Sequence, residues 1–334
     1  MRARLFPGVF GLVVWCAGHG WAQAPAGPPA PYRLLVAKNC QALDQELERA
    51  AREGYAVELG WPSYELVLLR RSGPGETPAT YRVLDGKKAL EDALARRHCV
   101  VPDTLDTAGG RLRAIATTPG DPPCESVLLQ TSRTGTLDTE IQDAVSNGFH
   151  VIGMASDDSG HAALLQRAGG GSKASAALVA ASVQETLQQE LSARAAAGYR
   201  IASSSAWKET LFSLDHHEEV PKVEYRVLST TKSSTLEQEL NAAAAKGFRF
   251  TPGTLHAVQK GAVPMFGRLG TDYVAVVESG VGAREAPYYM VGARRFSTLI
   301  REFDDAVAKG FAPVALALGY SDQETIVLFE RPGK

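Results

Sequence analysis

Residues 223–254 read VEYRVLSTTKSSTLEQELNAAAAKGFRFTPGT, and this stretch contains the pattern that decides the fold. Its apolar start predicts a strand at 223–229, and the spacing of Leu236, Leu240 and Ala244 predicts a helix over about 235–246. Gly247 stands where a helix C-terminus favours a left-handed residue, and the alternation that begins at Phe248 predicts a second strand. The stretch therefore predicts a strand, a helix and a second strand.

The same pattern recurs in five other parts of the chain. Each copy has a leucine early in its helix and a second apolar residue four positions later, and five copies have a glycine and an aromatic residue eleven and twelve positions after the leucine. The six leucines are Leu43, Leu90, Leu137, Leu187, Leu236 and Leu299. Only the second copy departs, because an alignment without gaps places Val101 and Pro102 where the glycine and the aromatic residue stand elsewhere. This alignment also puts His98 at the end of the second helix.

A third apolar segment follows in every copy and completes a strand–helix–strand–strand (βαββ) unit. We expect an α+β fold of six tandem βαββ repeats, each a three-stranded mixed sheet covered by one helix. The first two strands should run parallel through a right-handed crossover, and the third should be added by a hairpin. A unit of this size buries too little surface to be stable alone, so neighbouring units should pack together or share sheets.

The expected organisation begins with a signal peptide at 1–24 and a lead-in rich in Pro, Ala and Gly at 25–31. The expected repeats are 32–75, 80–118 (degenerate), 124–168, 174–217, 222–279 (with an insertion at 258–270) and 286–332.

The N-terminal segment has the features of a cleaved secretory signal. Arg2 and Arg4 precede an apolar run at 5–17, and small residues follow up to Ala24. The run is shorter than the roughly 20 residues that a membrane-spanning helix needs. We expect cleavage after Ala22, a periplasmic or secreted location, and no transmembrane segment in the mature chain.

The charge of the chain argues against a nucleic-acid partner. The formal net charge is −2, and removal of the signal peptide takes away two arginines and no acidic residue, which leaves −4. A protein that binds the phosphate backbone usually carries a basic surface instead.

Several features resemble a small bacterial domain family of unknown function. These are a Tyr225-Arg226-Val227 strand, a helix with Leu236 and Leu240, Gly247-Phe248, and closing strands that end in arginine, such as 67–71 and 329–332. Tyrosine or phenylalanine replaces the tryptophan of that family in the five copies that have the glycine, and the second copy lacks the glycine. The resemblance implies a βαββ fold over nearly the whole mature chain and implies no enzymatic activity.

Catalytic and cofactor motifs are missing from the sequence. It contains no glycine-rich phosphate loop, nucleophile elbow, His-Glu-x-x-His or Cys-x-x-Cys motif, so we expect no cofactor. The densest polar cluster is 215–219, where Asp215, His216 and His217 could hold zinc or copper. Adjacent residues of a strand point to opposite faces, however, and a solvated turn is the favoured interpretation of this cluster.

Three cysteines remain after the signal peptide, and exported proteins favour disulfides. Cys99 ends the second helix, at the edge where second strands should begin, and Cys124 begins the first strand of the next copy, which belongs to that same edge. Cys40 lies between a strand and a helix, at the opposite edge. We therefore predict a Cys99–Cys124 disulfide and a free or buried Cys40.

The fifth copy alone has an insertion, whose apolar tip includes Met265 and Phe266 beside Arg268. These residues are candidates for a partner-binding loop, and a longer hairpin packed on its neighbour is the alternative. Two classes of function stay open. The first is an exported non-enzymatic repeat protein that binds a partner or ligand or acts as a scaffold. The second is a hydrolase or metal-dependent enzyme with a site between repeats near Asp215, His216 and His217.

Overall fold

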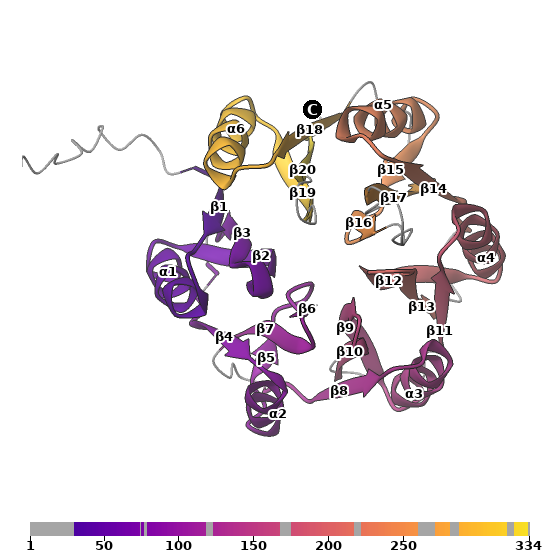
Figure 1. Ribbon diagram of the computed structural model, residues 1–334, viewed down its shortest axis with the longest axis horizontal. Helices are drawn as coiled ribbons and strands as arrows, with labels where there is room; N and C mark the ends of the chain where they lie inside the picture. Colours follow the sequence, from indigo (N-terminus) through magenta and orange to yellow (C-terminus); the bar gives the residue numbers. More distant parts are fainter. Residues whose placement is uncertain are drawn as a thin grey trace, which may run out of the picture.

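The computed structural model describes residues 30–73, 75–76, 79–117, 123–167, 175–216, 222–259, 271–280, 287–318 and 324–332. Six units of one helix and one small sheet follow each other around a closed ring (Figure 1). The helices lie on the outside of the ring, and the sheets point inward like spokes (Figure 1). The expected α+β fold of six tandem βαββ units is confirmed. No helix among these residues is long and apolar enough to cross a membrane.

Each of the predicted leucines lies in a helix and is buried there. The helices are α1 (Cys40–Arg52), α2 (Lys87–Ala95), α3 (Thr134–Ser146), α4 (Gln184–Ala196), α5 (Ser233–Ala244) and α6 (Phe296–Ala308). The glycines that follow five of them have φ between 82° and 91°, the left-handed conformation expected at a helix C-terminus.

The strands fall into three sets according to their place in the unit. The first strands are β1 (Tyr32–Val36), β4 (Tyr81–Asp85), β8 (Ser126–Thr131), β11 (Ala176–Ala181), β14 (Tyr225–Thr230) and β18 (Tyr288–Ala293). The second strands are β2 (Tyr55–Trp61), β5 (Cys99–Val100) with β6 (Asp106–Ala108), β9 (Phe149–Asp157), β12 (Tyr199–Ala206), β15 (Phe248–Phe250) with β16 (His256–Gln259), and β19 (Ala312–Ala317). The third strands are β3 (Leu66–Arg71), β7 (Arg111–Thr117), β10 (Gly160–Arg167), β13 (Thr210–His216), β17 (Thr271–Ser279) and β20 (Thr325–Glu330).

The strand order within a unit differs from the mixed sheet that we expected. In every sheet the third strand lies between the first and the second and is antiparallel to both, as in the order β1-β3-β2. The helix crossover makes the first two strands parallel in direction, but it leaves a gap one strand wide between them. The third strand fills this gap, because a hairpin holds it beside the second strand and its other edge is then free to pair with the first. The second strand thereby becomes the innermost strand of the unit, and in repeats 2 and 5 its later part, β6 or β16, takes that place (Figure 1).

The hydrophobic cores lie between repeats rather than within them. Each of the six clusters of buried residues combines a helix and sheet of one repeat with strand residues of the next. One cluster joins the two ends of the chain, because it contains Leu299 and Phe303 of α6 together with Leu34 of β1 and Leu68 of β3. This cluster closes the ring without any exchange of strands.

Polar side chains of the helices also bind the exposed edge of the next first strand. In four helices the residue directly after the repeat leucine accepts a hydrogen bond from a backbone N–H of the next repeat's first strand. That N–H has no strand partner on this side. The four contacts are Val83 N to Asp44, Leu178 N to Asp138, Val227 N to Gln188 and Met290 N to Glu237, at 2.6 to 2.9 Å. In α6 the same position is Ile300, which packs into the closing core. The contact between the last and first repeats is therefore apolar at this point.

The second repeat corrects the ungapped alignment. Its helix ends at Ala95, one turn earlier than the others, and Arg97 takes the left-handed conformation (φ 60°) that glycine has elsewhere. His98 is thus not in the helix but follows it, where the other repeats have an aromatic residue, and its Nδ1 lies 3.1 Å from Thr117 O. The physical reason is the polarity of 96–98, which leaves no apolar side chain to bury a further turn.

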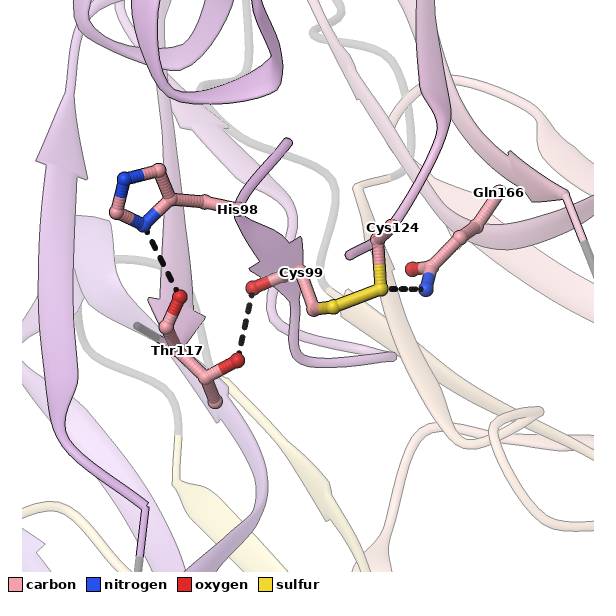
Figure 2. Close-up of a disulfide and its surroundings, with 5 residues drawn as sticks. All are labelled: His98, Cys99, Thr117, Cys124 and Gln166. Carbon is pink, nitrogen blue, oxygen red and sulfur yellow. Dashed lines mark hydrogen bonds between the residues drawn. A yellow bond between two sulfur atoms is a disulfide. The ribbon is translucent and has the colours of Figure 1, made fainter. Parts of the chain in front are cut away.

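Cys99 and Cys124, the pair expected to be bridged, form a disulfide with a Cα–Cα distance of 5.1 Å (Figure 2). The bond joins the second strand of repeat 2 to the segment that leads into repeat 3. Gln166 Nε2 also donates to Cys124 Sγ. Cys40 is the free cysteine of the described chain and is half-buried, and burial raises the pKa of its thiol.

Repeats 2 and 5, which lie opposite each other in the ring, share an interruption of the second strand. Both have a Pro-x-Thr-Leu turn, at 102–105 and 252–255. In each turn the threonine is fully buried, donates to the carbonyl three residues earlier and accepts from a backbone N–H of the third strand. The ring therefore has an approximate twofold relation between repeats 1–3 and repeats 4–6.

The helix-ending residue provides a test of the repeat register. Gly247→Val should lower the free energy of unfolding by about 1 to 2 kcal/mol or more, because a β-branched side chain is poorly tolerated at positive φ. Arg97→Gly should stabilise the protein by about 0.5 kcal/mol, since relief of the left-handed arginine exceeds the entropy that glycine adds to the unfolded chain. Urea midpoints of the main cooperative transition measure both changes. An unchanged midpoint for Gly247→Val would mean that the helix does not end there.

Candidate functional site

The loop candidates of the sequence analysis, Met265, Phe266 and Arg268, lie outside the described residues. So do His217, the signal peptide and all of the insertion except its first two positions.

Asp215 and His216 do not form a joint site. As neighbours in β13 they point to opposite faces: Asp215 Oδ2 lies 3.6 Å from His150 Nδ1, while the His216 ring stacks edge-on against Tyr199 at 5.0 Å. His216 Nε2 is also 3.1 Å from Ala197 O. Both side chains thus make contacts within or beside their own sheet. Nowhere in the described part of the chain do three His, Cys, Asp or Glu side chains gather closely enough to hold a metal ion.

The ring axis, by contrast, brings together side chains from all six repeats. Because the second strand is innermost in every sheet, its residues surround the axis (Figure 1). Two cavities lie there, with volumes of about 340 Å³ and about 90 Å³. Both are lined by Trp61, Leu105, Met154, Ser204, Leu255 and His256, so they are adjacent. We call these two cavities the axial site.

The two Pro-x-Thr-Leu turns meet within the axial site. Asp103 (φ 55°) and Gly253 (φ 75°) are equivalent residues of opposite repeats, and both line the larger cavity. A Cβ atom placed on Gly253 would lie 4.0 Å from Asp103 Oδ1, so the carboxylate reaches across to the opposite turn. Asp103 is held there by two backbone hydrogen bonds to its neighbours, Gly60 N to Asp103 O and Asp103 N to Ile152 O.

The residues directly after the two turns, Asp106 and His256, also occupy equivalent positions in repeats 2 and 5. Asp106 of repeat 2 accepts hydrogen bonds from Ser63 N at 2.9 Å and Ser63 Oγ at 2.7 Å. His256 of repeat 5 has Nε2 at 2.6 Å from Ser204 Oγ, whose hydroxyl donates to Gly253 O. Because that hydroxyl has one proton, the imidazole must donate from Nε2, which leaves Nδ1 as an acceptor. An acid and an imidazole therefore occupy matching positions around the smaller cavity.

Burial shifts the pKa of Asp103, Asp106 and His256. It raises the pKa of Asp106 to about 7, against the opposing hydrogen bonds from Ser63, and lowers the pKa of His256 to about 4. It raises the pKa of Asp103 to about 6. Asp103 is accessible to solvent in the cavity although protein surrounds it on most sides, as expected for a side chain that projects into an enclosed space. At neutral pH the site thus holds a charged Asp103 and a neutral His256.

A second polar cluster lies at the tips of the hairpins of repeats 3 and 4. Ser156 Oγ is 3.0 Å from His161 Nδ1 and 2.9 Å from Ser205 Oγ, and His161 Nε2 is 3.6 Å from Glu209 Oε1. The order of carboxylate, imidazole and hydroxyl is that of serine hydrolases. However, Ser156 is only 8% exposed and its hydroxyl is shared with Ser205. This cluster therefore serves as a contact between repeats.

The turn at 157–160 has the same connecting role. It links β9 to β10, and the Asp157 carboxylate accepts hydrogen bonds from Thr107 Oγ1 and Gly110 N of repeat 2 as well as from Ser159. Repeats 2, 3 and 4 are thus joined at their hairpin tips.

Sequence reasoning missed the axial site because its residues belong to no catalytic motif. Trp61, Ser204 and Asp103 lie near one another only after the ring closes. The one available signal was the Pro-x-Thr-Leu segment shared by 102–105 and 252–255. No protein-family model, curated protein or solved structure matches this chain. The resemblance to a bacterial domain family stays a prediction.

Asp103→Asn should stabilise the protein at neutral and alkaline pH. A raised pKa in the folded state means that the charged carboxylate opposes folding, and this cost is absent below the unfolded pKa of 3.8 and develops as the pH rises through about 6. We expect a gain of about 1 kcal/mol at pH 8, after allowance for solvent that reaches the side chain. Asparagine also tolerates positive φ, so only the pH-dependent part of the difference is informative.

Thermal melts of both proteins at pH 4, 6 and 8 measure this effect. A difference in Tm that does not grow between pH 4 and pH 8 would show that Asp103 is ordinarily solvated.

Proposed function

We propose that the protein is exported and binds a ligand in the axial site without transforming it. The observation that supports this proposal is that side chains of all six repeats line one pair of adjacent cavities on the ring axis. A closed ring of repeats needs no cavity for its own stability, since its cores lie between neighbouring sheets.

The composition of the axial site fits ligand binding. Small-molecule sites are concave, mostly apolar and supplied with a few fixed polar groups, with volumes of roughly 300 to 1,000 Å³. The larger cavity, of about 340 Å³, has apolar walls that include Trp61, Met154 and Leu255. Its polar groups are held in place: Asp103 by the backbone hydrogen bonds of its turn, and His256 by the Ser204 hydroxyl.

Two features favour export. The N-terminal segment at 1–24 has the composition of a secretory signal. The Cys99–Cys124 disulfide is typical of proteins in the periplasm or outside the cell. A periplasmic or secreted binding protein therefore accounts for both.

The alternative of a hydrolase or metal-dependent enzyme near Asp215, His216 and His217 has less support. Asp215 and His216 point away from each other, and neither lines a cavity of the axial site. A scaffold that uses the outer surface is a further option, but no described surface feature favours it as the axial site favours a ligand.

Tryptophan fluorescence can test the proposal directly. The chain has four tryptophans, of which Trp15 and Trp21 belong to the expected signal peptide. Trp207→Phe in a chain that starts at residue 23 leaves Trp61 as the only tryptophan, and Trp61 lines both cavities. We expect members of a panel of small neutral, cationic and anionic compounds to change its emission saturably and to raise Tm.

The matched control is Trp61→Phe, in which Trp207 reports from the hairpin tip. Its emission should not respond to the same compounds, although Tm should still rise. A panel in which no compound shifts either Trp61 emission or Tm would argue against a ligand at the axis.

A further inference from the structure

The charged side chains that line the axial site are of one sign. Its described lining includes the carboxylates of Glu58, Asp103 and Asp106 and contains no lysine or arginine. At neutral pH the only imidazole, that of His256, is uncharged because burial lowers its pKa to about 4. The field at the axis therefore favours positive charge.

Two of these carboxylates already have protein partners. Glu58 accepts a hydrogen bond from Arg70 Nε at 3.0 Å, and Asp106 accepts two from Ser63. Asp103 differs, because its pKa is raised by burial alone, with no neighbouring charge or hydrogen bond contributing among the described residues. Its carboxylate thus projects into the cavity, partly shielded from bulk water and without a counter-charge among the described residues, and a cationic ligand would supply that counter-charge.

The opposite wall leaves room for such a ligand. The residue equivalent to Asp103 in repeat 5 is Gly253, which has no side chain, so the carboxylate projects from one turn only. Of these two equivalent turns, only the one in repeat 2 therefore directs a carboxylate toward the axis. Neither turn needs the carboxylate for its own geometry, because the buried threonines hold both turns in the same way.

Aromatic rings of the first repeat complete the surroundings. Tyr32 and Trp61 line the same cavity as Asp103, and Tyr64 lines the smaller one with Trp61. The face of an aromatic ring attracts a cation, most strongly for tryptophan, and carboxylate with aromatic walls is the chemistry that recognises ammonium groups. Apolar walls such as Met154 and Leu316 suit the hydrocarbon part of the ligand.

We propose that the axial site binds a small organic cation, with the ammonium group at the Asp103 carboxylate and the hydrocarbon part against Trp61. This inference rests on the proposed ligand-binding function and specifies the class of ligand. An ammonium group supplies the counter-charge that the Asp103 carboxylate lacks, whereas a neutral ligand would leave the carboxylate uncompensated.

The test compares two cations with their neutral isosteres by isothermal titration calorimetry. The pairs are choline with 3,3-dimethylbutan-1-ol, and benzylamine with benzyl alcohol. At least one cation should bind ten times more tightly than its isostere or better, and Asp103→Asn should remove that preference. Glu58→Gln is the matched control, because Glu58 lines the same cavity but is paired with Arg70, and it should retain the preference to within threefold.

The pH dependence of choline binding provides a second readout, since choline carries a permanent charge. Its affinity should fall about tenfold per pH unit below about 6 as Asp103 takes up a proton. The other titratable groups of the cavity are Tyr32, Glu58 and His256, and the fall should be absent from Asp103→Asn but present in Glu58→Gln and His256→Gln.

Each outcome decides between the two proposals. If isosteres bind as tightly as the cations, or if Asp103→Asn keeps the preference, the cation assignment is wrong while ligand binding at the axis stands. The cation assignment also fails if neither cation binds but other compounds change Trp61 emission. Failure of every compound in both assays would overturn ligand binding itself.

Discussion

The structure depends on one constraint, which is that no repeat covers its own sheet completely. Each helix packs between its own sheet and the next one, so every hydrophobic core belongs to two repeats. Side chains such as Asp138 and Glu237 then bind the free edge of the following first strand, which both satisfies its N–H groups and fixes the angle between neighbours. With six contacts between neighbouring repeats the array returns to its start, and α6 packs on β1 (Figure 1).

The axial site is a consequence of that closure. The third strand lies in the middle of each sheet, so the second strand faces the axis, and each repeat contributes only a few residues to the cavities. The repeats contribute different side chains. Repeat 2 has Asp103 and Asp106 where the opposite repeat 5 has Gly253 and His256. Approximate symmetry in the backbone thus supports an asymmetric set of side chains, as recognition of one ligand molecule requires. The uncompensated charge of Asp103 is the kind of local cost that folded proteins retain at functional sites.

The sequence was sufficient to predict the helices, the left-handed glycines and the number of repeats, because a periodic stripe such as Leu236, Leu240 and Ala244 depends only on local geometry. It was insufficient for the strand order, since pairing of the third strand with the first is a contact between distant segments. The second repeat was misaligned because a helix one turn shorter was not considered, although the polar residues at 96–98 indicate it. The axial site could not be predicted, because Trp61 and Asp103 line the same cavity only once the ring closes. Ring closure depends on the angle between repeats, which the sequence pattern does not give.

Closure of the ring is the central claim, and a double-mutant cycle across the last contact tests it most directly. Leu34 of β1 and Phe303 of α6 belong to one core although 269 positions separate them. The variants Leu34→Ala, Phe303→Leu and their combination should give a coupling energy of about 0.5 to 3 kcal/mol from urea unfolding of the main cooperative transition. Effects of the two substitutions that add within error would show that the first and last repeats do not pack together, and the axial site would then have no closed wall.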